Sequence, residues 1–230
     1  MMDRVRTQQV DRWVVAVDGP SGSGKSTVSR RLAARLGAQY LDTGAMYRAV
    51  TWAVLRRGVD PADADAVVKV AGDVQVTITT DPEHPGVRVD HRAVEGEIRG
   101  PEVTAAVSAV AAVPGVRRLL VASQRQIIAA AGRIVVEGRD IGTVVAPDAA
   151  LKVFLTASVD ERARRRGTEQ GTELAATVAD LSRRDRLDSS RPTDPLQAAP
   201  DAVHLDTTEL GIDEVVSRLV ELVGRQGARA

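Results

Sequence analysis

The sequence predicts an α/β fold in which a mostly parallel sheet is flanked by helices and carries a small antiparallel insertion. Apolar, valine-rich runs alternate with segments of helical periodicity, a glycine-rich loop follows the first run, and one central stretch has the alternation of a hairpin. Apolar residues make up 43% of the 230-residue chain, enough for a single core. We therefore expect one domain over residues 13–223, with frayed ends at 1–12 and 225–230.

The first predicted strand and helix flank the glycine-rich loop. Residues 13–17 are all apolar, which is typical of a strand buried on both faces. In residues 26–36 apolar side chains recur at helical spacing, and Gly37 suits the end of a helix. Strand, loop and helix are therefore expected in that order.

Four more strand-like runs follow along the chain. They are expected at residues 39–41, 134–137, 151–155 and 203–205. Helical patterns follow the first, third and fourth of these runs. The alternation predicts five mostly parallel strands wrapped by helices.

Two segments depart from this alternation. Residues 74–79 and 87–94 alternate apolar and polar side chains around a Pro- and Gly-containing turn, which predicts an antiparallel hairpin inside an insertion of about residues 62–100. Residues 160–191 are rich in arginine around a break at residues 167–171, and we expect a lid there.

Composition excludes several classes of protein. With 31 basic and 31 acidic residues the formal net charge is +0, and only five aromatic residues occur (Trp 2, Tyr 2, Phe 1), so nucleic-acid binding is not expected. The absence of cysteine excludes disulfides, thiolate zinc sites and a cysteine nucleophile. No apolar run approaches membrane-spanning length, so a cytoplasmic protein without membrane partners is expected.

The glycine-rich loop matches the phosphate-binding pattern G-x-x-x-x-G-K-[S/T] and lies where that pattern requires, between a strand and a helix. Its glycines allow backbone N–H groups to approach phosphate oxygens, and the helix dipole adds about half a positive charge. We expect Lys25 to reach the β- and γ-phosphates of a nucleoside triphosphate and the Ser26 hydroxyl to ligate Mg²⁺. The residues predicted at this site are Gly19, Pro20, Ser21, Gly22, Ser23, Gly24, Lys25, Ser26 and Thr27.

The loop alone does not choose among GTPases, motor ATPases and small-molecule kinases. Two further segments, residues 41–48 (LDTGAMYR) and 137–143 (EGRDIGT), follow predicted strands at their carboxyl ends, where doubly wound sheets bind ligands. Within the first of them, Asp42 and Thr43 are equally compatible with a helix cap and with a ligand contact.

These two segments and residues 19–27 together resemble the bacterial cytidylate kinases, and the likeness runs from residue 14 to about residue 223. The resemblance implies a P-loop kinase fold with a core that binds ATP, an insertion in the monophosphate-binding region, and an arginine-rich lid with acceptor-binding helices. It implies transfer of the γ-phosphoryl group of ATP to CMP or dCMP with Mg²⁺, by a monomer.

The resemblance also implies which residues bind the acceptor. Arg48, Arg139 and Arg191 are implied at its phosphate with Arg99 nearby, and the planar fork of arginine suits phosphate oxygens. The full set implied to bind CMP is Asp42, Thr43, Gly44, Arg48, Arg99, Ser108, Arg117, Arg139, Asp140, Arg184, Asp188 and Arg191.

The cytosine-reading set is implied to be Ser108, Arg117 and Asp140. A carboxylate that faces an exocyclic amine penalises uracil, because uracil leaves buried polar groups unpaired. CMP and dCMP are therefore expected to be better acceptors than UMP.

Arg184 and Asp188 are implied at the acceptor sugar. Their spacing and that of Arg191 place the three side chains on one helical face. Without the resemblance, a solvated helix with local ion pairs is the more common interpretation of such a charged run.

The implied catalytic residues are Lys25, Arg139, Arg162, Arg165 and Arg191. Spacing does not decide which of the lid arginines at 162, 165 and 166 reach inward, nor whether Asp18, Glu137 or Asp140 assists Mg²⁺. Guanylate, uridylate and shikimate-like kinases stay as alternatives. A GTPase-like switch is disfavoured, since neither N-K-x-D nor D-x-x-G occurs.

Overall fold

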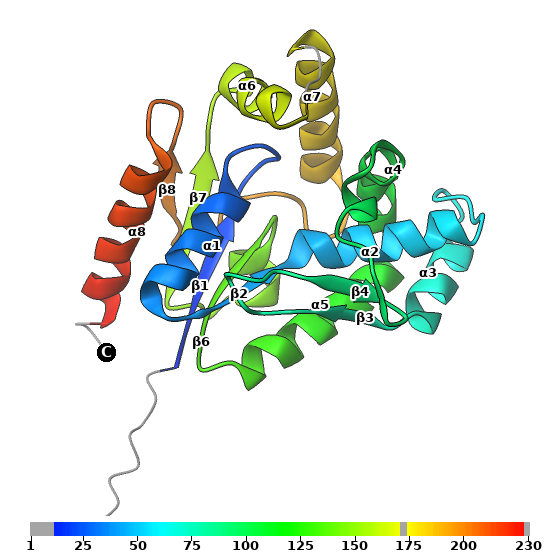
Figure 1. The fold of residues 1–230 in the computed structure, drawn as a ribbon, viewed down its shortest axis with the longest axis horizontal. Coiled ribbons are helices and arrows are strands. Elements are labelled where there is room, and N and C mark those ends of the chain that lie inside the picture. The colour runs from blue at the N-terminus through cyan, green and yellow to red at the C-terminus, as the bar shows by residue number, and fades with distance from the viewer. Residues whose placement is uncertain (1–11, 171–173, 228–230) are drawn as a thin grey trace, which may run out of the picture.

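A computed structural model describes residues 12–170 and 174–227 (Figure 1). Its main sheet has five strands in the order β2-β6-β1-β7-β8, and every neighbouring pair is parallel. The strands are β1 (Trp13–Asp18), β2 (Gln39–Asp42), β6 (Arg133–Gly138), β7 (Leu151–Thr156) and β8 (Val203–Asp206). The predicted five-stranded parallel sheet is confirmed.

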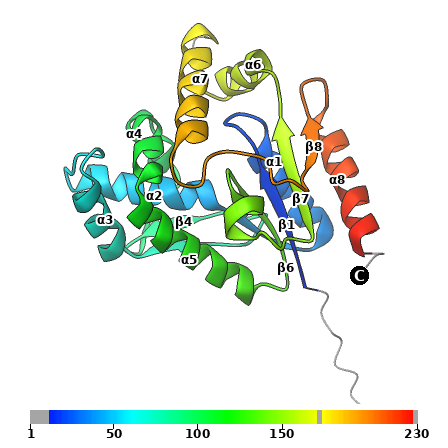
Figure 2. The ribbon, with the colours of Figure 1, turned by 180° about the vertical axis from the view of Figure 1, so that it is seen from behind.

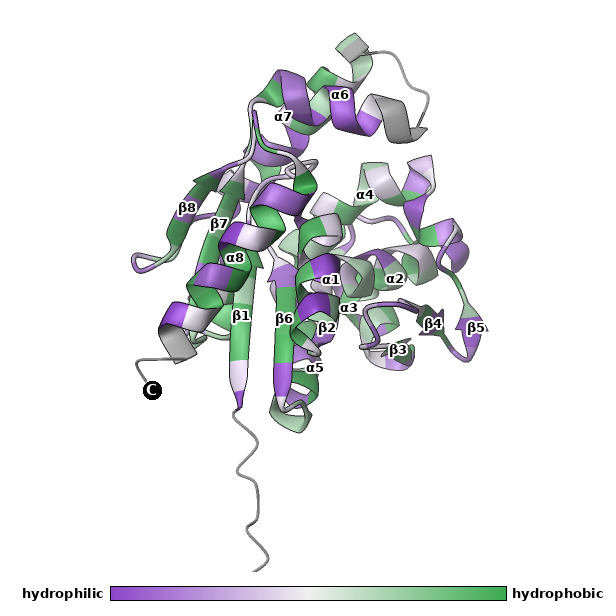
Figure 3. Ribbon diagram, turned by 60° about the vertical axis from the view of Figure 1, so that its left-hand side comes forward, coloured by the Kyte–Doolittle hydropathy of each residue, from purple (hydrophilic) through white to green (hydrophobic). Residues whose placement is uncertain are grey.

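Helices cover both faces of this sheet, and two more lie beyond its strand ends. The helices of the described residues are α1 (Lys25–Leu36), α2 (Thr43–Arg56), α3 (Ala64–Asp73), α4 (Pro101–Ala112), α5 (Pro114–Ala130), α6 (Val159–Gln170), α7 (Leu174–Ser190) and α8 (Ile212–Gly227). Because successive strand residues point to opposite faces, Val15 and Val17 pack with α1 and α8, whereas Ala16 packs with α2, α4 and α5. The middle residues of the central strands are accordingly apolar, and polar residues lie toward the strand ends (Figure 3).

The insertion forms a separate antiparallel sheet of three short strands, β3 (Val76–Ile78), β4 (Val87–Val89) and β5 (Arg92–Ala93). The predicted hairpin corresponds to β3 and β4. The single strand expected over residues 87–94 is wrong, because Asp90 and His91 adopt positive φ angles of 48° and 69° and turn the chain back into β5. Two successive residues with positive φ make the tight turn that suits a hairpin.

Helices α4 and α5 fill a region in which no element was predicted from the sequence. A proline occupies the first turn of each helix, where its missing N–H is not needed. Among the described residues no single helix is long and apolar enough to span a membrane, although this pair, bent by 93°, passes the same test when its two helices are taken together.

Helices α6 and α7 contact each other and lie beyond the carboxyl ends of the strands, at the top of Figures 1 and 2. Helix α6 continues through Gly167 to Gln170, so the predicted break does not begin at Gly167. Residues 171–173 lie outside the described residues. So do residues 1–11 and 228–230 of the predicted frayed ends, whereas residues 225–227 still belong to α8.

Two helical glycines should respond in opposite ways to alanine. A Cβ on Gly115, in α5, would lie 2.4 Å from a Val68 methyl on α3, whereas a Cβ on Gly72 would meet nothing within 4 Å. We expect Gly115→Ala to lower the unfolding free energy by about 1–3 kcal/mol through overpacking. Gly72→Ala should raise it by about 0.5–1 kcal/mol through helix propensity. Urea titrations check both values, and equal effects of the two substitutions would contradict the packing of α5 on α3.

Candidate active site

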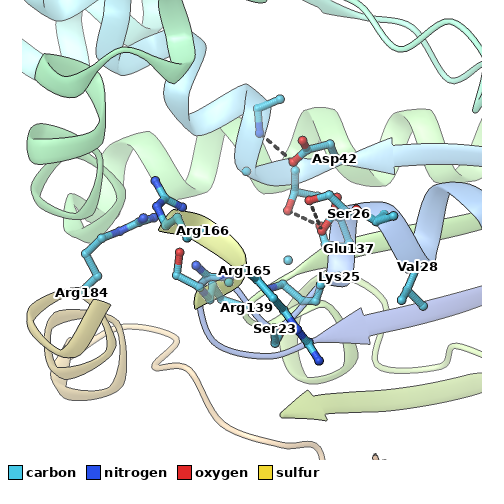
Figure 4. Close-up of a pocket in the computed structure, with 18 of the residues that line it drawn as sticks. Ser23, Lys25, Ser26, Val28, Asp42, Glu137, Arg139, Arg165, Arg166 and Arg184 are labelled. Atoms are coloured by element: carbon cyan, nitrogen blue, oxygen red, sulfur yellow. Dashed lines mark hydrogen bonds between the residues drawn. The ribbon is translucent and has the colours of Figure 1, made fainter. Parts of the chain in front are cut away.

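A cavity of about 750 Å³ opens at the carboxyl end of the sheet (Figure 4). Its walls come from the glycine-rich loop, the starts of α1 and α2, helices α4 and α5, the residues after β6, and helices α6 and α7, which occupy the segment predicted to be a lid. Cationic side chains outnumber carboxylates in this lining, although the whole chain has a formal net charge of +0. A locally positive hollow at this edge of a parallel sheet suits an anionic ligand.

The glycine-rich loop sits tightly against the sheet. A Cβ on Gly19 would lie 2.1 Å from the carbonyl oxygen of Leu155, and Gly24 begins α1 with a left-handed φ of 86°. Residues other than glycine rarely adopt that backbone geometry. The pattern of glycines that predicted the loop thus has a steric cause here.

Lys25 is buried at the start of α1. Its Nζ donates to the carbonyl oxygen of Pro20 at 2.7 Å, and Arg139 Nη1 donates to that of Gly19 at 2.9 Å. Burial, helped by the charge of Arg139, lowers the pKa of the Lys25 ammonium. An anion beside Lys25 would oppose that lowering.

Glu137 is the carboxylate that adjoins Ser26. The Ser26 hydroxyl donates to Glu137 Oε2 at 3.0 Å, and the Tyr40 hydroxyl donates to Oε1 of the same group. Burial raises the pKa of Glu137. Of the three carboxylates left open by the sequence, Asp18 instead accepts the N–H groups of residues 141 and 142, and Asp140 pairs with an arginine.

The oxygens of Ser26 and Glu137 could supply one or two ligands to a hard cation, but not a complete set. Serine and carboxylate oxygens are ligands that Mg²⁺ accepts, but no group of three or more His, Asp or Glu side chains within residues 12–170 and 174–227 is placed to hold a metal. This fits a Mg²⁺ ion bound by one or two protein oxygens together with phosphates.

Buried guanidiniums line the middle of the cavity. Arg184 is 5% exposed, and its Nε and Nη1 have no hydrogen-bond partner among the described residues. Burial lowers the pKa of Arg184 to about 10 and that of Arg48 to about 9. Arg48 donates to Thr104 Oγ1 at 3.0 Å, and Arg139 pairs with Asp188 at 2.9 Å.

The far end of the cavity is built around Arg117, whose side chain is only 2% exposed. Its Nη2 donates to Asp140 Oδ2, its Nε donates to Asp194 Oδ2 at 2.8 Å, and its guanidinium carbon lies 5.7 Å from the ring centroid of Tyr47. Burial raises the pKa of Asp140 despite the nearby arginine.

The lid arginines differ in position. Arg162 does not line the cavity, because its guanidinium donates to the carbonyl oxygen of Ser21 at 2.9 Å and pairs with Asp185 at 2.7 Å. Arg165 lines the wall and donates to the carbonyl oxygen of Thr207 at 2.6 Å. Arg166 extends toward Arg184 from the opposite lid helix (Figure 4).

The structure brings together all twelve residues implied at the acceptor, since each lines the cavity. From the loop, Gly19 and Pro20 stay outside the lining and offer only carbonyl oxygens to Arg139 and Lys25. Asp42 caps α2 through Ala45 N at 2.9 Å and also lines the cavity. The sequence pattern gave no sign of Tyr40 or Asp194, whose contacts come from remote parts of the chain.

A parallel sheet with a phosphate loop after its first strand, beneath an arginine-bearing lid, defines a P-loop kinase for a small anionic acceptor. A family model described as cytidylate kinase matches residues 15–225. The chain belongs to the cytidylate kinase family.

Individual relatives agree with this assignment. The cytidylate kinases of Rhodococcus opacus and Nocardia farcinica are each 56% identical over 218 residues, which covers 93% of this chain and 95% and 94% of theirs. A solved structure of an uncharacterized protein from Eubacterium ventriosum superposes with a TM-score of 0.54 at 9% identity, covering 93% of this chain and 99% of that one. That likeness shows the fold alone.

Asp18 should make stability depend on pH. Burial outweighs its two backbone hydrogen bonds and raises its pKa from 3.8 to about 6, so the folded protein binds more protons than the unfolded chain between these values. The contribution of Asp18 to stability therefore falls as pH rises through this window. Asn at this position does not titrate. The unfolding free energy of the unchanged protein, measured relative to that of Asp18→Asn, should therefore fall by about 1 kcal/mol from pH 5 to pH 7. Urea titrations at both pH values measure the difference, and one that does not change with pH would exclude the raised pKa.

Proposed function

We propose that this chain transfers the γ-phosphoryl group of ATP to CMP or dCMP and forms ADP with CDP or dCDP. One observation carries the proposal: a single cavity is lined by Lys25 and the phosphate loop, by the buried Arg117–Asp140 pair, and by Arg184, whose Nε and Nη1 are unpaired among the described residues. These groups suit a triphosphate, a base and an acceptor phosphate held in one cavity.

At the donor end, the backbone N–H groups of the loop and the Lys25 ammonium bind the β- and γ-phosphates. Ser26 would ligate Mg²⁺, and Glu137, which accepts a hydrogen bond from the Ser26 hydroxyl, orients that oxygen. The ion held there would neutralise charge on the phosphates. Of Asp18, Glu137 and Asp140, Glu137 is the assisting carboxylate because it hydrogen-bonds to Ser26.

In the middle of the cavity, Arg48, Arg139 and Arg191 bind the acceptor phosphate. Arg184 and Asp188 bind its sugar from one face of α7, where both are buried. This burial does not fit the alternative of a solvated charged helix for these two side chains. Their burial costs free energy unless partners are supplied, and a nucleotide supplies them.

At the far end, Asp140 accepts a hydrogen bond from the exocyclic amine of cytosine. Arg117 donates to the ring carbonyl, and Ser108 lies nearby on α4. Uracil presents a carbonyl oxygen to Asp140 in place of the amine, which leaves buried acceptors facing each other. This arrangement favours CMP and dCMP over UMP.

The reaction proceeds by in-line attack of an acceptor phosphate oxygen on the γ-phosphorus, with no covalent enzyme intermediate. The acceptor is already anionic, so no dedicated general base is required. Lys25, Arg139, Arg165 and Arg191 spread the charge of the transition state, and the lid of residues 160–191 excludes water. Arg162, which links the loop to Asp185, holds the lid over the phosphates.

We further propose a cytoplasmic monomer whose partners are ATP, CMP and dCMP and which binds neither nucleic acid nor membrane. The neutral net charge and the scarcity of aromatic residues argue against nucleic-acid binding, and the neutral net charge also argues against an anionic membrane as partner. The insertion of residues 62–100 closes the monophosphate end of the cavity through Arg99, which lines it.

The test is ADP release from Mg-ATP with CMP, dCMP, UMP, GMP, AMP and shikimate offered separately. Rapid turnover confined mainly to CMP and dCMP is expected. Preference for GMP, UMP or shikimate would replace the proposal with the corresponding alternative kinase.

Lys25→Ala should keep the fold and lose activity. The ammonium donates its hydrogen bond to the Pro20 carbonyl of the loop, and burial already disfavours its charge, so the melting temperature should change little. Without the ammonium, kcat should fall by about 10²-fold or more. Lys69→Ala, on the exposed face of α3, is the matched control. Near-normal rates for purified Lys25→Ala would show that its phosphate role is wrong.

Asp140→Asn should weaken the choice of base. An amide can donate to the carbonyl of uracil as well as accept from cytosine, so the CMP-to-UMP ratio of kcat/KM should fall by about tenfold. Steady-state kinetics measure the ratio, with Asp148→Asn as the exposed control. An unchanged ratio would place base recognition elsewhere.

A further inference from the structure

We propose that Asp194 is a positioning residue of the acceptor site, which holds the base-facing Arg117 and the phosphate-facing Arg191 in one fixed relation. The inference rests on the proposed function, since it requires the base of the acceptor to lie at Arg117. Asp194 lies in the segment that connects the C-terminal end of α7 to β8 (Figure 2).

Asp194 contacts the two arginines with different parts of itself. Its carboxylate Oδ2 accepts from Arg117 Nε at 2.8 Å. Its backbone carbonyl oxygen accepts from Arg191 Nε at 2.8 Å and also from Arg191 Nη2. One residue therefore sets the positions of guanidiniums that lie on α5 and beyond the end of α7.

The contacts of Arg117 leave one guanidinium nitrogen without a protein partner among the described residues. Asp194 takes Nε, Asp140 takes Nη2, and the ring of Tyr47 lies against the guanidinium. Nη1 is buried and has no hydrogen-bond partner in the described part of the chain, and Arg117 lines the cavity. Because Nε and Nη2 are both hydrogen-bonded, the orientation of the planar guanidinium is fixed, and so is the direction of its remaining N–H groups.

Without Asp194, the hydrogen bond from Nη2 to Asp140 would be the one remaining carboxylate contact of Arg117 among the described residues. The guanidinium could then turn about that contact and lose the direction of Nη1. A second consequence concerns charge, because the buried arginine would keep only one carboxylate partner. Recognition of the base should suffer in both respects.

The backbone at Asp194 supports a specific role. Its φ of 49° is left-handed, which is uncommon for residues other than glycine, though aspartate tolerates it better than most. Leu196 N donates to Asp188 O at 2.8 Å and ties this turn to the end of α7. The turn that aims the Asp194 carbonyl at Arg191 is thus attached to the helix that carries Asp188.

A purely structural role makes a different prediction. If Asp194 only neutralised buried charge for folding, its loss would lower stability and would affect ATP and every acceptor alike. If it positions Arg117 and Arg191, the loss should act on the acceptor and its base. The contacts of Asp194 lie at the acceptor end, and none is to the glycine-rich loop.

The experiment uses Asp194→Gly, which keeps the backbone geometry accessible, and Asp194→Asn, which keeps an acceptor oxygen. The control is Asp201→Asn, since Asp201 also pairs with a buried cation, Lys152 at 2.9 Å, but outside the cavity. Steady-state kinetics with CMP, UMP and ATP are combined with calorimetric titration of CMP into the enzyme alone and with melting temperatures.

For Asp194→Gly we expect KM and Kd for CMP to rise about tenfold, the loss typical of a charge-assisted hydrogen bond. The CMP-to-UMP ratio of kcat/KM should fall, and KM for ATP should stay within about twofold of the unchanged protein. Asp194→Asn should lie between Asp194→Gly and the unchanged protein. Asp201→Asn should match the unchanged protein in CMP affinity, in the CMP-to-UMP ratio and in KM for ATP.

Unchanged CMP affinity and base preference in either folded variant would overturn the inference, as would equal losses for CMP, UMP and ATP. If Asp194→Gly fails to fold, Asp194→Asn decides by the same criteria. Failure of the unchanged protein to phosphorylate CMP would overturn the proposed function and this inference together, whereas normal CMP turnover with indifferent variants would overturn the inference alone.

Discussion

Positive charge buried around an open cavity is the constraint on which the rest of this structure depends. Lys25, Arg117 and Arg184 are each less than a tenth exposed, so these basic groups are withdrawn from the water that would solvate their charges. Burying an ion without partners costs several kcal/mol. The scaffold has to hold these side chains in place before a ligand arrives, and an anionic ligand then supplies the missing partners.

The chain meets this constraint with paired carboxylates and with backbone geometry. Asp140 accepts from Arg117 and Asp188 from Arg139, and Arg117 Nη1 is left without a partner among the described residues. Asp18, at the end of β1, holds the turn after β6 through two backbone N–H groups at 2.8 Å. Parallel strands bring these carboxyl-end residues to one edge of the sheet, so that distant segments of the chain build one site.

The sequence was sufficient for the parts of the fold whose periodicity is local. Apolar runs and glycine positions predict the strand, loop and helix of residues 13–36 and the succession of the later strands along the chain. Helix α4 was missed because alanine and valine occupy most of its positions, so no polar face marks a period. Strand β5 was missed because the turn before it uses Asp90 and His91, neither of which is a glycine.

Within the site, motif residues were predictable and their supports were not. The residues carried over by resemblance line one cavity, because they occur in continuous motifs at strand ends. Arg162 shares the spacing of its lid neighbours, but its burial under the loop depends on Asp185 in another helix, which spacing does not encode. Asp194 acts through contacts to Arg117, 77 positions away in sequence.

The most direct test of this account is an experimental structure with CMP and a non-hydrolysable ATP analogue bound together. We expect the triphosphate in the glycine-rich loop against Lys25, the acceptor phosphate against Arg48 and Arg139, and the cytosine against the Arg117–Asp140 pair. Phosphates bound away from these guanidiniums, with Arg184 still unpaired, would contradict the claim that the buried charges exist to receive the two nucleotides.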